Sequence, residues 1–251
     1  MLKNKSMTNS QILILLATYN EAHNVEKIYE LVREAVPDAD ILFVDDNSPD
    51  GTGGIINAIA KRDSHVHTIH RSGKMGIGSA HRDGISWAYD HQYSTLVTMD
   101  SDFAHSPDYI SEFVAEGRDA DVVIGTRFVR KDSLSEWNAG RKFITHLGHF
   151  LTRFFLGMPY DATGAFRCYA LDRLPRSIFS RVPAIDYAFF FQSLHILHLN
   201  GRKVVEIPIL LPARVYGSSK MANADILRGF WQLLSYACSA RLNRRWYLVE
   251  R

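Results

Sequence analysis

Short apolar segments alternate with segments of helical periodicity through the first half of the chain, and this order constrains the fold more than any other feature. Runs of strand length occur at Ile12–Ala17, Ile41–Val44, Val66–Ile69, Leu96–Met99 and Val122–Gly125. Between them, hydrophobic residues recur every three or four positions, as expected for amphipathic helices. Strands separated by such helices predict an α/β fold with a mostly parallel central sheet, covered by helices on both faces.

The length and composition predict one catalytic domain with a C-terminal extension. The chain has 251 residues, 46% of them hydrophobic, and no Pro-, Gly- or Ser-rich linker divides it. We expect a flexible segment over residues 1–10, a catalytic domain over 11–221, and an amphipathic helix with a basic tail over 222–251. No window of about 18 uncharged apolar residues predicts a transmembrane helix. The first apolar run lacks the cleavage site of a secretion signal.

The net charge limits the classes of partner that the chain can bind, and the cysteine content indicates its cellular compartment. A formal net charge of +2 is too small for the basic surplus of a nucleic-acid-binding protein, so we expect no nucleic-acid partner. Cys168 and Cys238 lie far apart and lack metal-site spacing, which indicates thiols in a reducing compartment. We therefore expect a cytoplasmic protein.

Polar residues follow four of the predicted strands at the point where each strand ends. These segments are Thr18-Tyr19-Asn20-Glu21, Asp45–Thr52, Asp100-Ser101-Asp102 and Thr126-Arg127. Each alone is typical of a turn or a helix N-cap. The carboxyl ends of parallel strands share one edge of the sheet, where ligands of such folds bind. Four polar strand ends on one edge therefore predict a functional site.

Three glycine clusters fail to complete phosphate-binding motifs. Gly73-Lys74 would need glycine at position 68 and Ser or Thr at 75 for a P-loop, where the chain has Thr68 and Met75. The clusters Gly51-Thr52-Gly53 and Gly76-Ile77-Gly78 lack the third glycine of the dinucleotide fingerprint. The sequence therefore supports neither an ATPase nor a Rossmann dehydrogenase.

Asp100 and Asp102 place two hard oxygen ligands together at a strand end. Such a pair suits Mg²⁺ or Mn²⁺ that substrate phosphates also hold, so both residues are predicted metal ligands. His65, His67 and His70 suggest a zinc site by type, but no Cys or carboxylate partner accompanies them. We interpret these histidines as exposed or hydrogen-bonded structural residues.

Eight segments follow one another in an order that is specific in combination. They are Ala17–Glu21, Val44–Thr52, Arg71–Ala80, Met99–Asp102, Gly125–Phe128, Arg141–Thr145, Thr163–Arg167 and Arg214–Lys220. Together they resemble the family 2 glycosyltransferases of GT-A fold, and within that family the polyprenyl-phosphate sugar transferases such as dolichol-phosphate mannose synthases. The resemblance covers nearly the whole chain.

This resemblance implies inverting transfer of a sugar from a nucleotide-sugar donor to a polyprenyl or dolichyl phosphate, with Mg²⁺ or Mn²⁺ as cofactor. GDP-mannose is the expected donor. The implied substrate-binding residues are Thr18, Tyr19, Glu21, Asp45, Asp46, Lys74, Asp100, Ser101, Asp102, Arg127, Arg141, Thr145, Arg214 and Lys220. Among them, Glu21, Asp45 and Asp46 would hold the ribose and base of the donor.

The same resemblance implies a division of work around the phosphates. Asp100 and Asp102 would bind the metal on the donor diphosphate. The residues that fall at the acceptor phosphate are Arg127, Arg141 and Thr145, and those that would clamp the donor diphosphate are Arg214 and Lys220. The implied catalytic residues are Asp102, Arg127, Arg141, Arg214 and Lys220.

Four positions depart from the family pattern and leave the identity of the sugar open. Ala104 stands where the family often has a polar side chain after the metal pair. The usual Thr-Ser-Gly-Phe-Arg motif appears here as Thr163-Gly164-Ala165-Phe166-Arg167. Gln192 stands where the family frequently has a glutamate. The fold and the class are unaffected. Glucose, a hexosamine or an aminosugar are accommodated by the same fold.

Chemistry argued from the residues keeps two other functions open. A phosphate acceptor is largely dianionic at neutral pH and needs no general base, whereas a hydroxyl acceptor would need a carboxylate such as Asp186 or Asp161. A family 2 enzyme acting on a hydroxyl is therefore one alternative, and a nucleotide-sugar binding module without turnover is another. Arg167 is interpreted either as a phosphate ligand or as a structural cation.

Two amphipathic segments in the last half suggest contact with a membrane surface. The residues Phe143, Ile144, Leu147, Phe150, Leu151, Phe154 and Phe155 form a wide apolar helix face, typical of either a core helix or an interfacial one. A second pattern consists of Ile226, Phe230, Leu233, Leu234 and Ala237, followed by Arg241, Arg244, Arg245 and Trp246. A basic and aromatic end suits lipid headgroups. We expect a peripheral protein at the cytoplasmic face of a membrane.

Overall fold

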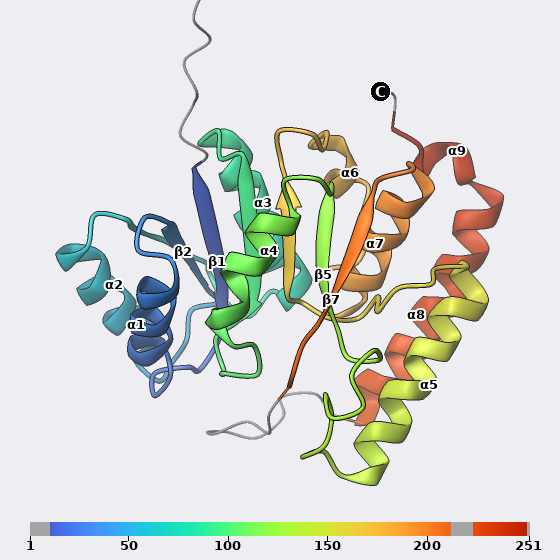
Figure 1. Cartoon of the computed structure of the whole chain (residues 1–251), viewed down its shortest axis with the longest axis horizontal. Helices are drawn as coiled ribbons and strands as arrows, with labels where there is room; N and C mark the ends of the chain where they lie inside the picture. Colours follow the sequence, from blue (N-terminus) through green and yellow to red (C-terminus); the bar gives the residue numbers. More distant parts are fainter. Residues whose placement is uncertain (1–10, 212–222, 250–251) are drawn as a thin grey trace, which may run out of the picture.

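The computed structural model describes residues 11–211 and 223–249 of the chain, and its elements follow the predicted alternation (Figure 1). The strands are β1 (Ile12–Thr18), β2 (Asp40–Asp45), β3 (Val66–His70), β4 (Thr95–Asp100), β5 (Val122–Thr126), β6 (Arg167–Ala170) and β7 (Val204–Pro208). The helices are α1 (Val25–Ala35), α2 (Thr52–Arg62), α3 (Ile77–Asp90), η1 (Pro107–Tyr109, a 3-10 turn), α4 (Ile110–Glu116), α5 (Ala139–Leu156), α6 (Ser177–Ser180), α7 (Ala188–Leu199), α8 (Asn223–Leu242) and α9 (Arg244–Tyr247).

Within the described residues, the sheet has seven strands in the order β3-β2-β1-β4-β6-β5-β7. The pairs β3/β2, β2/β1, β1/β4 and β5/β7 are parallel, and only β6 runs antiparallel, between β4 and β5. The apolar alternation predicts neither β6 nor β7, because β6 is four residues long and β7 is only partly buried. The mostly parallel α/β fold is confirmed.

Both faces of the sheet are buried, as in other parallel sheets. Along β1, Leu13 and Leu15 belong to a core cluster with residues of α3 and α7, while Ile14 and Leu16 belong to a second cluster with residues of α1, α2 and α4. Helix α3 packs very close to β1, since a Cβ atom on Gly84 would lie 1.8 Å from Leu15 Cδ1. This two-sided packing holds the strand ends in fixed positions.

All strands except β6 end at the same edge of the sheet, at the bottom of Figure 1. We call it the carboxyl edge. Helix α5 starts at this edge and runs upward beside α8, with which it is in contact (Figure 1). The predicted flexible segment 1–10 and the predicted domain boundary at residue 221 lie outside the described residues.

Helix α8 packs on α7 through part of the predicted apolar pattern. Leu233 and Ala237 are buried, together with Tyr236, whereas Phe230 is 37% exposed. The amphipathic pattern read from the sequence therefore describes mainly the side of α8 that faces the protein.

Candidate active site

The loop after β2 is organised around Asp45, whose side chain is buried (2% exposed). Its carboxylate accepts hydrogen bonds from the backbone N–H of Ser48 at 3.2 Å and from the Ser48 hydroxyl at 2.5 Å. The Thr18 hydroxyl, at the end of β1, lies 3.3 Å from the same carboxylate. The Ser48 hydroxyl in turn accepts the N–H of Asn20 at 2.9 Å. Asp45 thus ties the loops after β1 and β2 together.

Asp50 makes a second link between these two loops. Its carboxylate accepts the N–H of Ala22 at 3.0 Å, the N–H of Thr52 at 3.1 Å and the Thr52 hydroxyl at 2.6 Å. Burial raises the pKa of this carboxyl, but these hydrogen bonds outweigh burial and lower it, so Asp50 stays ionised. The Thr52 hydroxyl accepts a hydrogen bond from the N–H of Glu21 at 2.9 Å, and this contact holds Glu21 next to Thr52.

Two asparagines in these loops adopt a left-handed backbone conformation. Asn20 has φ 56° and Asn47 has φ 55°. Asparagine tolerates this region better than most residues do, and non-glycine residues held there cluster at functional sites. The local backbone therefore agrees with a ligand-binding role for the loops.

Asp46 connects the loop after β2 to the loop after β3. Its carboxylate lies 2.5 Å from Nη1 of Arg71, and its other oxygen accepts the N–H of Met75 at 3.1 Å. Arg71 is 3% exposed and also lies 3.1 Å from Asp83. Burial raises the pKa of Asp46 against the lowering effect of Arg71. A buried ion pair therefore closes the loop that carries Lys74.

Lys74 and Tyr19 extend this arrangement across the site. The Lys74 ammonium nitrogen lies 4.7 Å from the centre of the Tyr19 ring, within the range of a cation–π contact. The structure thus brings together the predicted donor residues of three loops, Thr18 and Tyr19 after β1, Asp45 and Asp46 after β2, and Lys74 after β3.

Asp100 and Asp102 lie at the end of β4, at the centre of the carboxyl edge. The side chain of Asp100 is 29% exposed, whereas Asp102 is buried at 6%. Asp102 accepts the N–H of Ala104 at 3.1 Å, and the hydroxyl of Ser101 donates to Ala17 O at 3.3 Å. Phe103, which directly follows Asp102, has a left-handed backbone conformation with φ 62°. The predicted metal ligands thus occupy a tight, strained turn.

His105 stabilises this turn through a hydrogen bond to Asp100. The sequence did not identify His105 as a site residue. Its Nδ1 accepts the backbone N–H of Asp100 at 3.0 Å, and the residue is 4% exposed. The imidazole ring packs on Phe166 with centroids 5.1 Å apart. The only signal in the sequence is a histidine three residues after the carboxylate pair.

The donor set at Asp100 and Asp102 fits Mg²⁺ or Mn²⁺. Both residues offer hard carboxylate oxygens, and the side chain of Asp100 is partly exposed to solvent. In the parts of the chain that the structure describes, no group of three or more His, Cys, Asp or Glu side chains forms a complete metal site. A cation here would need further oxygen ligands, which the phosphates of a nucleotide sugar supply.

Two of the three histidines in and next to β3 have hydrogen-bonded side chains. His65 Nδ1 lies 2.7 Å from Asp40, and His70 Nε2 lies 2.8 Å from Asn57. His67 is 3.9 Å from Asp40 and packs against Trp87. These contacts agree with the interpretation of the three histidines as structural residues.

Arg127, at the end of β5, forms a bidentate pair with buried Asp161. Nε lies 2.7 Å from Oδ2 and Nη2 lies 2.5 Å from Oδ1, while the backbone N–H of Arg127 donates to Oδ2 at 3.0 Å. Nη2 also contacts the hydroxyl of Thr163. Burial opposes ionisation of Asp161, yet Arg127 lowers the pKa of this carboxyl. Asp161 is thereby committed to Arg127, which disfavours it as a general base.

Arg141 and Thr145 lie one turn apart at the start of α5, so they share a helix face. Asn138 caps the helix by accepting the N–H of Arg141 at 2.9 Å. The guanidinium of Arg141 stacks over the ring of Trp137 at 3.5 Å from its centre. Arg214 and Lys220, the other predicted phosphate ligands, lie outside the described residues.

Arg167 is a structural residue. It is 0% exposed, so the alternative interpretation as a phosphate ligand is wrong. Its guanidinium donates to the carbonyls of Gly164 at 2.9 Å, Ala162 at 2.9 Å and Phe190 at 2.8 Å. Arg167 therefore fastens the segment that follows Asp161 to helix α7.

Asp186, the other candidate base, precedes α7 and contacts α8. One carboxylate oxygen accepts the N–H of Ala188 at 3.1 Å, and the other accepts Nε2 of Gln232 at 2.8 Å. Gln192 faces inward and accepts the N–H of Ala184 at 3.0 Å. Both side chains therefore stabilise the junction of α7 with its neighbours.

Large apolar side chains are exposed along α5 and α8, which lie side by side (Figure 1). On α5 they are Phe143 (68%), Ile144 (42%), Leu147 (42%), Phe150 (60%) and Phe154 (67%), and on α8 they are Leu227 (62%), Phe230 (37%), Trp231 (62%) and Leu242 (84%). We call this surface the α5/α8 face. None of the described helices is both long enough and apolar enough to cross a membrane.

The sequence of the chain matches a protein-family model and a set of curated relatives, among them the two that follow. The model, "Glycosyl transferase family 2", matches residues 13–174. The polyprenol monophosphomannose synthase of Mycolicibacterium smegmatis is 34% identical over 235 residues, covering 92% of this chain and 89% of the relative. The undecaprenyl-phosphate mannosyltransferase of Micrococcus luteus is 33% identical over 232 residues, covering 92% and 96% respectively.

Solved structures share the fold of the chain. Glucosyl-3-phosphoglycerate synthase from Mycobacterium tuberculosis, in complex with Mn²⁺, UDP and glucosyl-3-phosphoglycerate, aligns with a TM-score of 0.67 at 18% identity, covering 92% of this chain and 81% of that one. A mannosyltransferase from Pyrobaculum calidifontis, in complex with GDP-Man and Mn²⁺, aligns with a TM-score of 0.57 at 15% identity, covering 93% and 64% respectively. These similarities confirm the GT-A fold.

Proposed function

The chain belongs to glycosyl transferase family 2 and is a glycosyltransferase, and from this premise we propose that it transfers mannose from GDP-mannose to a polyprenyl phosphate. The names of the two curated relatives, which it matches over most of its length, support this donor sugar and this acceptor class. The observation that carries the proposal is the position of α5. This helix starts at the carboxyl edge, the edge at which β4 and its carboxylate pair also end, and bears an exposed apolar face.

An acceptor with a charged head and an apolar tail matches that arrangement. The polar loops of the carboxyl edge suit a nucleotide and its phosphates, while the α5/α8 face suits a hydrocarbon chain. A hydrophilic glycan would leave most of this wide apolar face, including its aliphatic side chains, without a partner. The geometry therefore favours a lipid phosphate over a sugar hydroxyl.

The donor site in this proposal comprises the loops after β1, β2 and β3. In it, Glu21, Asp46 and the cation–π pair of Tyr19 and Lys74 would contact the base and ribose, a role that their positions in these loops support. Hydrogen bonds already fix these loops, so little ordering is required when the nucleotide binds. Mg²⁺ or Mn²⁺ at Asp100 and Asp102 would neutralise the diphosphate and make it a better leaving group.

The acceptor phosphate would lie between Arg127 and the first turn of α5. Arg141 lies in that turn and Thr145 lies one turn later, and both are suited to a phosphate group, Arg by its planar guanidinium and Thr by its hydroxyl. Arg127 is held in place by Asp161 and contributes mainly as a fixed positive charge near Asp100. Arg214 and Lys220 remain proposed ligands of the donor diphosphate.

The proposed reaction is one in-line displacement. A phosphate oxygen of the acceptor forms a bond to the anomeric carbon of the sugar, and the bond from that carbon to the diphosphate breaks. The configuration inverts, and the electron pair of the broken bond leaves with the nucleoside diphosphate. No proton transfer is required, because the acceptor is already an anion. This agrees with the commitment of Asp161 to Arg127.

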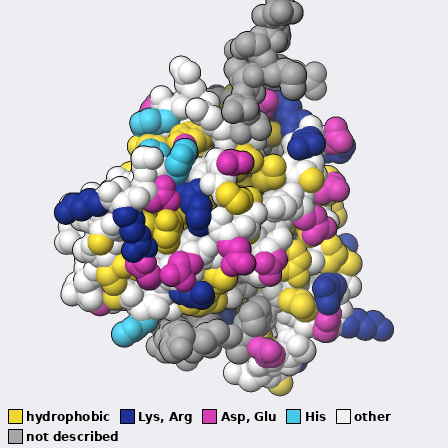
Figure 2. Space-filling view, turned by 60° about the vertical axis from the view of Figure 1, so that its left-hand side comes forward, with side chains coloured by type: hydrophobic (Ala, Val, Ile, Leu, Met, Phe, Trp, Pro, Cys, Tyr) yellow, Lys and Arg dark blue, Asp and Glu magenta, His cyan; other side chains and the backbone are white. Residues whose placement is uncertain are grey.

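We also propose that the protein associates with the membrane that contains its acceptor, through the α5/α8 face. Many large apolar side chains exposed along two adjacent helices are unusual on a soluble protein and indicate an interaction site. The face that carries α1 and α2 differs, since acidic and basic side chains are interspersed there with small hydrophobic areas (Figure 2). Peripheral binding at the cytoplasmic side would place the acceptor head at the carboxyl edge.

A transfer assay tests the proposed function. The purified protein is incubated with Mn²⁺ or Mg²⁺, a short-chain polyprenyl phosphate and labelled nucleotide sugars, and label in the organic phase is counted. We expect transfer from GDP-mannose, and a loss of about a hundredfold or more in Asp102→Asn, because the metal contributes several kcal/mol. The matched control, Asp90→Asn, alters an exposed aspartate paired with Arg176 and should keep full activity.

Two outcomes would contradict the proposal. Release of nucleoside diphosphate with a hydroxyl acceptor, and no labelled lipid, would establish transfer to a hydroxyl instead. Donor binding without any product over hours would establish a binding module without turnover. Transfer from another nucleotide sugar to the lipid would correct the sugar alone.

A further inference from the structure

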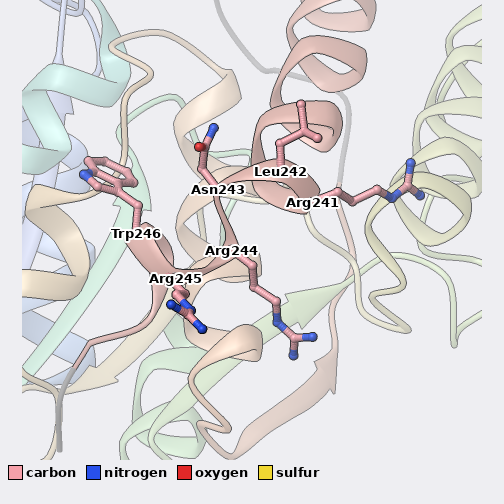
Figure 3. A pocket seen from close by; sticks show the side chains of 6 residues that line it. All are labelled: Arg241, Leu242, Asn243, Arg244, Arg245 and Trp246. Carbon is pink, nitrogen blue, oxygen red and sulfur yellow. The ribbon is translucent and has the colours of Figure 1, made fainter.

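Helix α8 ends in a turn that exposes three arginines, a leucine and a tryptophan. Arg241, Leu242, Asn243, Arg244, Arg245 and Trp246 line a shallow pocket of about 420 Å³ (Figure 3). We call this segment the arginine turn. Leu242 is 84% exposed and Trp246 is 53% exposed. The turn lies at the upper end of α8 in Figure 1, far from the carboxyl edge.

The backbone of the arginine turn is anchored to the protein from below. Tyr247 is buried, and its carbonyl accepts Nδ2 of Asn200 at 2.9 Å. Arg181 donates to the carbonyl of Trp246 at 2.8 Å, and the Tyr247 hydroxyl lies 3.1 Å from that of Ser239. These contacts use the backbone and Tyr247. The side chains of Arg244 and Arg245 remain at the surface and are not needed for the fold.

The heads of the arginines diverge instead of meeting at one point. In Figure 3, Arg241 extends toward α5, where it donates to the carbonyl of Phe155 at 3.1 Å, while Arg244 and Arg245 extend away from it. A single bound phosphate would need converging donors. Diverging guanidinium groups beside exposed apolar side chains suit a surface with many headgroups, which is an anionic bilayer.

Leu242 also continues an exposed stripe along α8. At about 100° per residue, Trp231 and Leu242 lie within about 60° of Leu227 around the helix axis. These three side chains are all more than half exposed. The stripe is part of the α5/α8 face, so the arginine turn lies at the end of a surface already proposed to meet lipid. A nucleic acid fits less well, because leucine and tryptophan are exposed among the arginines and the net charge is only +2.

We propose that the arginine turn binds anionic lipid headgroups and gives the protein a second, charge-dependent contact with the bilayer. The exposed apolar side chains extend along α5 and α8, and the arginine turn lies at the end of α8 that is far from the carboxyl edge, so the two contacts together fix the orientation of the catalytic domain. The inference rests on the proposed membrane association and is independent of the sugar and of the reaction.

Vesicle binding of the full chain tests the inference. Sedimentation is measured with vesicles of phosphatidylcholine alone and with vesicles that contain 30% phosphatidylglycerol, chosen as the probe of anionic charge. We expect tighter binding to the anionic vesicles and a loss of about fivefold per arginine, or about 25-fold, in Arg244→Gln/Arg245→Gln. The matched control is Lys27→Gln/Lys61→Gln, which removes the same charge from exposed positions on α1 and α2 and should change binding less than about twofold.

Three results would overturn the inference. These are equal binding to both kinds of vesicle, unchanged binding of the arginine variant, and an equal loss in the lysine control. Competition by inorganic phosphate at millimolar concentration would indicate a site for a free anion. Transfer to a water-soluble acceptor in the absence of lipid should be the same for the parent and the arginine variant, so a failure of the proposed function is measured separately.

Discussion

The loops of the carboxyl edge bury polar side chains, whereas the α5/α8 face exposes apolar ones. In the loops, carboxylates are buried and hydrogen-bonded, with Asp45 2% exposed and Asp46 5% exposed. On the α5/α8 face, aromatic side chains are exposed, with Phe143 at 68% and Phe154 at 67%. The loops therefore bury charged groups, and the α5/α8 face exposes hydrocarbon to solvent.

This difference indicates what each region binds. Buried carboxylates are stable only where donors are fixed around them, so the loops are built before the donor arrives. Exposed aromatic side chains gain stability only from something outside the protein, such as a lipid. The comparison therefore separates a preorganised polar site from a surface that is completed by its partner.

Of the single substitutions, one that breaks the buried pair of Arg127 and Asp161 should have the largest effect on stability. Asp161→Asn leaves the Arg127 guanidinium buried without its counter-charge, and we expect the free energy of unfolding to fall by about 3–5 kcal/mol. Urea denaturation measures this change. The control is Asp132→Asn, which removes an exposed pair with Arg130 and should cost about 1 kcal/mol or less. Equal losses in the two variants would mean that the polar site is not preorganised by this pair.

Loss of the His105 acceptor should have the next largest effect. His105→Phe keeps the ring against Phe166 but leaves the N–H of Asp100 without its acceptor. We expect the affinity for Mn²⁺ in the presence of GDP to fall by about 10–100-fold, as for other groups that orient metal ligands. Isothermal titration calorimetry measures it without turnover. His105→Asn offers an acceptor near the Nδ1 position and should restore most of the affinity; if Asn and Phe behave alike, His105 only fills space.

The sequence predicts the fold and the edge of the sheet because both follow from local patterns. Leu13 to Leu16 form an apolar run because β1 is buried on both faces, and the strand order of a parallel sheet puts Thr18, Asp45 and Asp100 at one edge. The polar type of these residues then predicts a site. No long-range information is needed for these steps.

The partners of the buried charges could not be predicted, since they lie far apart in the sequence. Arg127 meets Asp161 across 34 residues, and Arg71 meets Asp46 across 25. Only the packed structure reveals that Asp161 is committed to Arg127, or that Arg167 binds carbonyls. The periodicity of α5 is equally ambiguous, because a core helix and an interfacial helix share one pattern.

Acid should also lower the stability of the fold, through two buried histidines in the core around α7. Burial, followed by Arg167 and His105, lowers the pKa of His81 to about 3, and burial, followed by His198 and Arg244, lowers that of His195 to about 4. In the unfolded chain histidine binds a proton near pH 6.5. Stability present above pH 6.5 is therefore lost as the pH falls toward 4, by about 1.4 kcal/mol per pH unit for each histidine.

Unfolding measured between pH 7.5 and 4.5 checks this prediction. His195→Asn keeps a polar group near Tyr236 and removes one proton site, so the slope of stability against pH should become shallower by about 1.4 kcal/mol per unit. His23→Asn, at an exposed position, is the control and should leave the slope as in the parent. An unchanged slope in His195→Asn would mean that acid acts on other groups.

Substitutions on the α5/α8 face should have the smallest effect on stability, although they remove large aromatic side chains. Phe150→Ser/Phe154→Ser alters residues that are 60% and 67% exposed, so we expect the free energy of unfolding to change by no more than about 0.5 kcal/mol per substitution. Thermal unfolding at several protein concentrations measures this value. A clear destabilisation that grows with concentration would mean that a second copy of the chain covers the face. A neutral result in solution, together with weaker binding to vesicles, would leave the membrane as the partner that completes this surface.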